Sequence, residues 1–154
     1  MDPTDDILDK TVAEIQEAIL NEARSVYSET VIDHFLHPRN LGRMEDPDGF
    51  ASVTGPCGDT MHIFLKMRAG KLTEARFMTD GCASTVACGS IITELVKEKA
   101  IAEAVEVSAE DVIEACGGLP GSSVHCSVLA AQTLQEAIGN LVLSQKGKNR
   151  KIHT

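Results

Sequence analysis

An alternation of apolar and polar residues in the middle of the chain limits the folds that are open to it. Between positions 61 and 68, one side of the segment carries only apolar residues: Met61, Ile63, Leu65 and Met67. The intervening positions are polar, apart from Phe64. This period of two predicts a strand with one buried face, and a turn at residues 69–71 followed by residues 72–79 completes a hairpin. The chain is therefore expected to contain an antiparallel sheet with one face covered.

Segments with helical periodicity lie on both sides of this hairpin. Residues 5–24 carry one apolar stripe, with Thr4 as the expected N-cap; the stripe consists of Leu8, Val12, Ile15 and Ile19. Further helices are expected at residues 26–36, 83–99 and 109–116, and from Ser122 or Ser123 onward. Residues 39–59 are rich in glycine and proline and are expected to be mostly loop.

A hairpin that is followed by helices, rather than strands that alternate with helices, is typical of an α+β fold. With 154 residues, the chain is long enough for one domain with its own core. We divide it into an N-terminal helical extension (1–25), a main domain (26–144) and a flexible basic tail (145–154). The apolar stripe of the extension is expected to pack on the main domain or on a second copy of the chain, which would make the protein a homo-oligomer.

Charge and the first residues of the chain argue against several classes of protein. The formal net charge is -9, whereas a general nucleic-acid binder carries a basic surface, so no nucleic-acid partner is expected. The acidic start, Met1–Asp6, differs from the basic start of a secretory signal or a transit peptide. No apolar run approaches the roughly 20 residues of a membrane helix. These features predict a cytoplasmic protein with no membrane partner.

The five cysteines fall into two groups. An odd number of widely spaced cysteines in a chain without an export signal is a poor disulfide framework. Cys88 and Cys116 lie within apolar helical patterns and are expected to be core residues. Cys57, Cys82 and Cys126 lie instead at the boundaries between predicted elements. In a reducing compartment, such thiols are free to bind metal or to attack sulfur.

The boundary cysteines have neighbours that suit a metal or thiol site. Asp59 lies two residues after Cys57 in a glycine-rich loop that can turn both side chains toward one point. Cys82 and Cys126 are placed at the start of predicted helices, where unpaired N–H groups lower a thiol pKa. Cys126 directly follows His125. We therefore expect a surface site of three sulfurs, one carboxylate and one imidazole.

Each of these residues also has an ordinary structural interpretation. Cys57 could be a buried loop cysteine, Asp59 a turn residue and His125 a surface or capping histidine. The same five residues could hold structural zinc. A third alternative is an enzyme that uses Cys126 as nucleophile and His125 as base, although adjacent helical residues point about 100° apart. A sulfur carrier without a cluster would need only one of the cysteines.

Five motifs, in order between Tyr27 and Leu143, resemble the IscU/NifU-N scaffold proteins of iron–sulfur cluster biogenesis. The matching stretches begin with Tyr27-Ser28-Glu29-Thr30-Val31-Ile32-Asp33-His34-Phe35 and His37-Pro38-Arg39-Asn40-Leu41-Gly42. They continue with Pro56-Cys57-Gly58-Asp59, Asp80-Gly81-Cys82-Ala83-Ser84 and His125-Cys126-Ser127-Val128-Leu129-Ala130. The resemblance implies a small antiparallel sheet packed by helices, of the IscU/SufE type.

The resemblance also implies a function and a ligand set. Cys57, Cys82 and Cys126 would hold an iron–sulfur cluster, expected to be [2Fe-2S], with Asp59 and His125 as candidates for the fourth position. A cysteine desulfurase would supply sulfur as a persulfide to Cys126, other partners would supply iron and electrons, and recipient apo-proteins would receive the cluster. Such a scaffold turns over no substrate and is not an enzyme. The alternative is a zinc-binding sulfur acceptor of the SufU type, which lacks the histidine that is present here as His125.

Two positions depart from the family pattern. Members that work with an Hsp70-type chaperone carry Leu-Pro-Pro-Val-Lys before the last ligands, whereas this chain has Leu119-Pro120-Gly121-Ser122-Ser123. That difference argues against the chaperone partnership. Family members commonly have serine where Cys88 stands, so this extra thiol is either a bystander or a spare sulfur acceptor.

Overall fold

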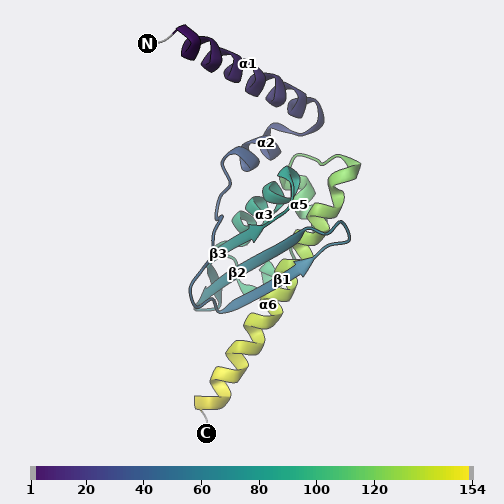
Figure 1. The fold of residues 1–154 in the computed structure, drawn as a ribbon. Helices are drawn as coiled ribbons and strands as arrows, with labels where there is room; N and C mark the ends of the chain where they lie inside the picture. Colours follow the sequence, from purple (N-terminus) through teal and green to yellow (C-terminus); the bar gives the residue numbers. More distant parts are fainter. Residues whose placement is uncertain (1–2, 153–154) are drawn as a thin grey trace.

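A three-stranded antiparallel sheet is the centre of the structure, a computed structural model that describes residues 3–152 (Figure 1). Its strands, in the spatial order β1-β2-β3, are β1 (Gly49–Thr54), β2 (Thr60–Arg68) and β3 (Lys71–Thr79). The predicted hairpin is β2 and β3, and Met61, Ile63 and Leu65 are fully buried as their alternation predicts. Met67 is only half-buried because the pairing with β3 shifts register between Lys66 and Met67.

Strand β1 lies inside the segment that was expected to be mostly loop, so that expectation is wrong for residues 49–54. The residues of β1 that face the core include Gly49 and Ala51, which give only a weak apolar alternation. Their small size has a structural reason. A Cβ atom at Gly49 would lie 2.5 Å from the carbonyl oxygen of Ala137, so a larger residue would push the covering helix away.

The helices differ from the expected ranges mainly at their ends. They are α1 (Pro3–Val26), α2 (Glu29–Leu36), α3 (Ala83–Val96), α4 (Ile101–Ala104), α5 (Ala109–Ala115) and α6 (Val124–Ile152), with a 3-10 turn, η1 (Gly121–Ser123), before α6. Helix α2 starts later than expected because Ser28 caps it by accepting a hydrogen bond from the Val31 N–H. The capping box of Ser108 and Asp111 at the start of α5 is confirmed. Helix α4 was not expected.

Helices α3 and α6 pack against the same face of the sheet, α3 over β3 and α6 over β1 and β2. The contact between α3 and β3 is close at Gly89, where a Cβ atom would lie 2.4 Å from the ring of Phe77. Most of the buried apolar residues lie between these two layers. The other face of the sheet is partly open and carries Phe50, whose ring stacks on His62 and lies at a tilt against Phe64. The predicted α+β class with a small antiparallel sheet is confirmed.

Helix α1 projects away from the rest of the chain (Figure 1). None of its residues is buried, and the stripe formed by Leu8, Val12, Ile15 and Ile19 is exposed. The expectation that this stripe packs on the main domain is therefore wrong, and its pairing with a second copy stays a prediction. The helix starts at Pro3, so Thr4 lies within its first turn rather than before it.

The C-terminal segment is also more regular than its composition indicates. Helix α6 continues to Ile152, across most of the tail that was expected to be flexible, and residues 153–154 lie outside the described part of the chain. The proposed domain boundaries stay a prediction. None of the helices in the described range 3–152 combines the length and the hydropathy that crossing a bilayer requires.

The close contact at Gly89 leads to a stability prediction. Gly89→Ala should lower the free energy of unfolding by about 1–2 kcal/mol, because the strain of overpacking against Phe77 exceeds the gain in helix propensity. Gly139→Ala on α6 is the matched control, since no atom lies within 4 Å of its added Cβ. The control should raise stability by about 0.5–1 kcal/mol. Urea unfolding measures both, and equal effects in the two variants would contradict the packing explanation.

Candidate metal site

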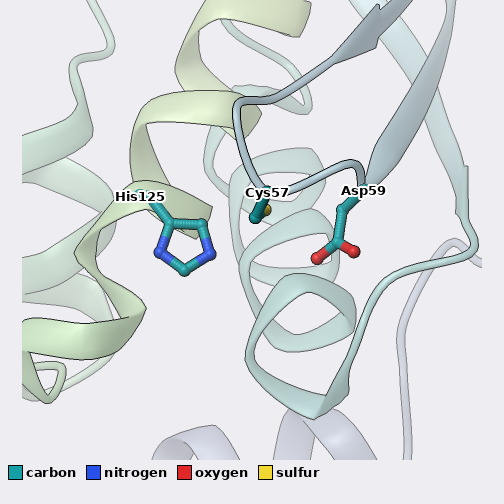
Figure 2. A group of neighbouring side chains, drawn as sticks. All are labelled: Cys57, Asp59 and His125. Atoms are coloured by element: carbon teal, nitrogen blue, oxygen red, sulfur yellow. The ribbon is translucent and has the colours of Figure 1, made fainter.

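The loop between β1 and β2 carries Cys57 and Asp59. It is closed by hydrogen bonds from the Gly55 N–H to the Asp59 carbonyl oxygen (2.8 Å) and from the Gly58 N–H to the Gly55 carbonyl oxygen (3.0 Å). Gly58 has a φ of 91°, a backbone conformation that residues other than glycine rarely adopt. This tight turn brings the exposed Cys57 and the half-buried Asp59 to the same end of the sheet, as the spacing predicts (Figure 2).

Cys82 occupies the N-cap position of α3, directly after the end of β3. Its side chain is exposed, and its sulfur lies 3.3 Å from the Ser84 hydroxyl and 3.6 Å from the Thr85 hydroxyl. Partial burial raises the pKa of the Cys82 thiol. Hydrogen bonds from the hydroxyls and backbone N–H groups of Ser84 and Thr85 lower this pKa by a larger amount, and the result is a pKa of about 7. The lowered pKa expected at a helix start is thus found at Cys82.

Cys126 differs from the sequence-based expectation in two respects. It lies in the first turn of α6, but its side chain is fully buried, so the site is not wholly on the surface. Burial raises the pKa of the Cys126 thiol, and this effect outweighs the hydrogen bonds from Thr85 and Ser84 that lower it. The lowered thiol pKa that the helix start predicts for Cys126 is therefore wrong. Its role as the persulfide acceptor stays a prediction.

The five predicted site residues converge from three separate segments of the chain. One ligand atom from each of Cys57, Asp59 and His125 lies within 4.8 Å of the other two (Figure 2). His125 Nε2 lies 3.6 Å from the Cys126 sulfur. The Thr85 hydroxyl connects the remaining members, at 3.1 Å from Asp59 Oδ2, 3.3 Å from the Cys126 sulfur and 3.6 Å from the Cys82 sulfur.

Two hydroxyl residues of this site were not predicted. Ser84 and Thr85 are buried in the first turn of α3, and Ser84 also contacts the Cys126 sulfur at 3.7 Å. The only feature of the sequence that indicates a place in the site is their position two and three residues after Cys82. A helix start turns the side chains of such residues toward the N-cap residue, but many serines and threonines occupy this position without any site nearby.

Cys88 and Cys116 do not belong to this group. Both are fully buried, which confirms the prediction that they are core residues. A hydrogen bond with the Cys116 thiol, together with burial, raises the pKa of Cys88 far above its usual range. A thiol that is neutral and sealed from solvent is poorly suited to accept sulfur from a partner protein.

Comparison with known proteins identifies the family. Residues 26–148 match the model of the NifU-like N-terminal domain, which is most of the chain. This protein belongs to that family. Helix α1 lies almost entirely outside the matched residues, in agreement with its separation from the rest of the fold.

Two relatives of this NifU-like domain carry the same name, that of an IscU scaffold protein. The chain is 46% identical over 114 residues to "Iron-sulfur cluster assembly scaffold protein IscU 1" of Archaeoglobus fulgidus, covering 73% of this chain and 74% of the relative. It is 39% identical over 127 residues to the IscU scaffold protein of Escherichia coli, covering 79% and 98%. A NifU-like N-terminal structure from Brucella abortus superposes with a TM-score of 0.64 at 18% identity, covering 77% and 95%. This structural likeness supports the fold alone.

The contrast between Cys82 and Cys126 predicts an order of alkylation in the metal-free protein. Near pH 7, iodoacetamide should modify the exposed Cys82 at least about tenfold faster than the buried Cys126, because only the thiolate reacts. The alkylation rate of Cys82 should rise with pH around a midpoint near 7. Ser84→Ala removes a hydrogen bond that lowers this pKa, so the midpoint should move to higher pH and the rate at pH 7 should fall.

Peptide mass spectrometry over a series of times and pH values measures these rates. The alkylation rate of Cys57, which lies on a different segment of the chain, serves as the internal control in the same sample. Equal alkylation rates at Cys82 and Cys126 would contradict the predicted difference between their thiol pKa values. An unchanged midpoint in Ser84→Ala would contradict the role of Ser84 in lowering the pKa of Cys82.

Proposed function

We propose that this protein is a scaffold on which an iron–sulfur cluster is assembled and from which it is transferred to recipient proteins. The observation that carries this proposal is the convergence of three thiols, a carboxylate and an imidazole from three segments of the chain. Relatives that are 39–46% identical to this chain over 114–127 aligned residues are named as such scaffolds. In this proposal, Cys57, Cys82 and Cys126 hold the cluster, and Asp59 or His125 provides the fourth ligand.

The types of donor atom suit a cluster that must be released. Thiolates are soft ligands for iron–sulfur clusters. A carboxylate or imidazole in the fourth position binds iron more weakly than a thiolate, which leaves one iron open to an incoming thiol. The exposure of Cys57 and Cys82 supports the proposal, because a recipient protein must reach the cluster to receive it. A [2Fe-2S] cluster is the form that we propose.

The partners follow from the chemistry of assembly. Assembly of the cluster consumes sulfide, iron and electrons, which a scaffold receives from other molecules. We therefore propose a cysteine desulfurase as the sulfur donor, with separate donors of iron and electrons and apo-proteins as recipients. The protein acts as a scaffold rather than as an enzyme. The Leu119–Ser123 segment, which contains η1, lacks the chaperone motif, so no Hsp70-type partner is proposed.

A zinc-binding sulfur acceptor is the second candidate function. The close grouping of Cys57, Asp59 and His125 favours it, because a thiolate, a carboxylate and an imidazole within 4.8 Å of one another could hold a single zinc ion. A structure described as a scaffold of the SUF system, from Fervidobacterium islandicum, shares the fold with a TM-score of 0.60. At 21% identity, that likeness does not distinguish the two functions.

Anaerobic reconstitution tests the proposal directly. Metal-free protein incubated with ferrous iron, cysteine, a cysteine desulfurase and dithiothreitol, which supplies the electrons that reduce persulfide sulfur to sulfide, should become coloured and should hold iron and inorganic sulfide in equal amounts. Cys57→Ser, Cys82→Ser and Cys126→Ser should each lose most of the cluster, whereas Cys116→Ala, the control, should retain it. Absorption and Mössbauer spectra measure the outcome. A colourless wild type that binds only zinc, or a control that loses as much cluster as the site variants, would contradict the proposal.

The role of Asp59 gives a separate prediction. If this carboxylate keeps the cluster labile, Asp59→Ala should hold its cluster several times longer and transfer it more slowly to an apo-ferredoxin. Asp59→Asn, which retains the size of the side chain without its charge, should behave similarly. Circular dichroism of the recipient measures transfer. Faster loss of the cluster from Asp59→Ala than from wild type would show that Asp59 retains the cluster instead.

A further inference from the structure

The Thr85 hydroxyl is the one group, among the described residues, that contacts Asp59, Cys82 and Cys126 together. Thr85 is fully buried and lies on α3, whereas Asp59 is on the β1–β2 loop and Cys126 is on α6. The three segments are far apart in the sequence, so the backbone does not join them directly at the site. A single side chain therefore links all three parts of the candidate metal site.

We propose that Thr85 is a positioning residue that assembles the ligands before the metal arrives. A hydroxyl has one proton to donate and two lone pairs that accept. While both thiols are protonated, Thr85 donates to Asp59 Oδ2 at 3.1 Å and its oxygen accepts from the thiols of Cys126 and Cys82, so that all three contacts exist at once. When one of these thiols ionises, the single proton of Thr85 can turn to that sulfur instead. Neither an apolar residue nor an acceptor-only side chain would allow this arrangement.

The β1–β2 loop needs such an anchor more than the other two segments do. Cys82 and Cys126 are attached to helices that pack on the sheet, whereas Asp59 lies in a turn with Gly55 and Gly58. Glycine-rich turns lose much conformational freedom when they become ordered. A second hydrogen bond, from the Thr60 N–H to Asp80 Oδ1 at 2.8 Å, secures the far end of the loop. Thr85 is the contact that directs the Asp59 carboxylate itself.

Gly81 provides the space that Thr85 requires. A Cβ atom at this position would lie 2.7 Å from the Thr85 Cβ and 2.8 Å from its hydroxyl oxygen. The backbone of Gly81 does not have a positive φ, so conformational freedom does not explain this glycine. The close approach to Thr85 does. Gly81→Ala therefore displaces the hydroxyl without removing it.

This inference rests on the proposed function in one respect, namely that the site binds a metal ion. A ligand that is ordered before the metal binds costs less conformational entropy on binding. Residues that orient metal ligands typically change metal affinity by about 10- to 100-fold. Because Thr85 acts on one flexible ligand and two helical ones, we expect an effect at the lower end, about tenfold.

The test uses zinc and cobalt with the metal-free full chain and needs no desulfurase. Thr85→Val keeps the shape of the side chain and should weaken zinc binding about tenfold, measured by competition with a chromophoric chelator. Thr85→Ser retains the hydroxyl and should restore the affinity. Thr133→Val is the matched control, because Thr133 is also buried and helical but its hydroxyl bonds only to the Leu129 carbonyl oxygen. It should bind zinc as wild type does.

A structural defect has a different signature from a positioning defect. Thermal unfolding of the metal-free Thr85→Val and Thr133→Val proteins should be similar, while only the former loses affinity. The thiolate-to-cobalt absorption should also be weaker in Thr85→Val at the same cobalt concentration, and Thr85→Ser should recover it. If Thr85→Val does not fold, Gly81→Ala should give the same loss of zinc affinity with the hydroxyl present.

Several results would overturn the inference. They are wild-type zinc affinity in Thr85→Val or Gly81→Ala, no recovery in Thr85→Ser, an equal loss in Thr133→Val, or no binding of zinc or cobalt by wild type. Failure of the proposed function has a different readout, the absence of a cluster after reconstitution. A chain that binds zinc through a Thr85-dependent site but assembles no cluster would retain this inference and lose the proposed function.

Discussion

The packing of α3 and α6 on one face of the sheet is the constraint on which the rest of the structure depends. Close contacts at Gly89 with Phe77 and at Gly49 with Ala137 hold both helices near the strands. Because the part of each helix that lies against the sheet is fixed, its first turn has a defined position relative to the end of the sheet. The β1–β2 loop lies at that same end (Figure 1). The apolar core thus determines where the thiols are, and Cys126 is itself part of that core.

The same packing produces a difference in environment among the site residues. Cys57 and Cys82 are exposed, while Cys126 is covered by the elements that surround the start of α6. Hydrogen bonds from Ser84 and Thr85 favour the Cys82 thiolate, and burial disfavours the Cys126 thiolate. One metal-free site therefore contains an accessible thiol that ionises near neutral pH and a buried thiol that does not. The candidate site thus combines an exposed outer thiol with an inner thiol that solvent does not reach.

The parts of the fold that were predictable are those with a strong local pattern. The alternation at Met61, Ile63 and Leu65 specified the hairpin, since a strand with one buried face must show it. Strand β1 was missed because its inward residues are small, and they are small because α6 lies against them. The apolar stripe of α1 has an equally strong pattern, yet it covers no surface of the main domain. A pattern shows that a face is apolar but does not identify what covers it.

The sequence by itself determined which residue types are available to the candidate site, namely three boundary cysteines, Asp59 and His125, together with the motifs that indicate the family. These follow from residue type and local spacing, which do not depend on the rest of the chain. Only the tertiary structure decided that Cys126 is buried, that burial raises the pKa of its thiol despite the helix start, and that the Thr85 hydroxyl connects the three segments. Burial and hydrogen bonding between distant residues depend on how helices and strands pack, and no local pattern contains that information.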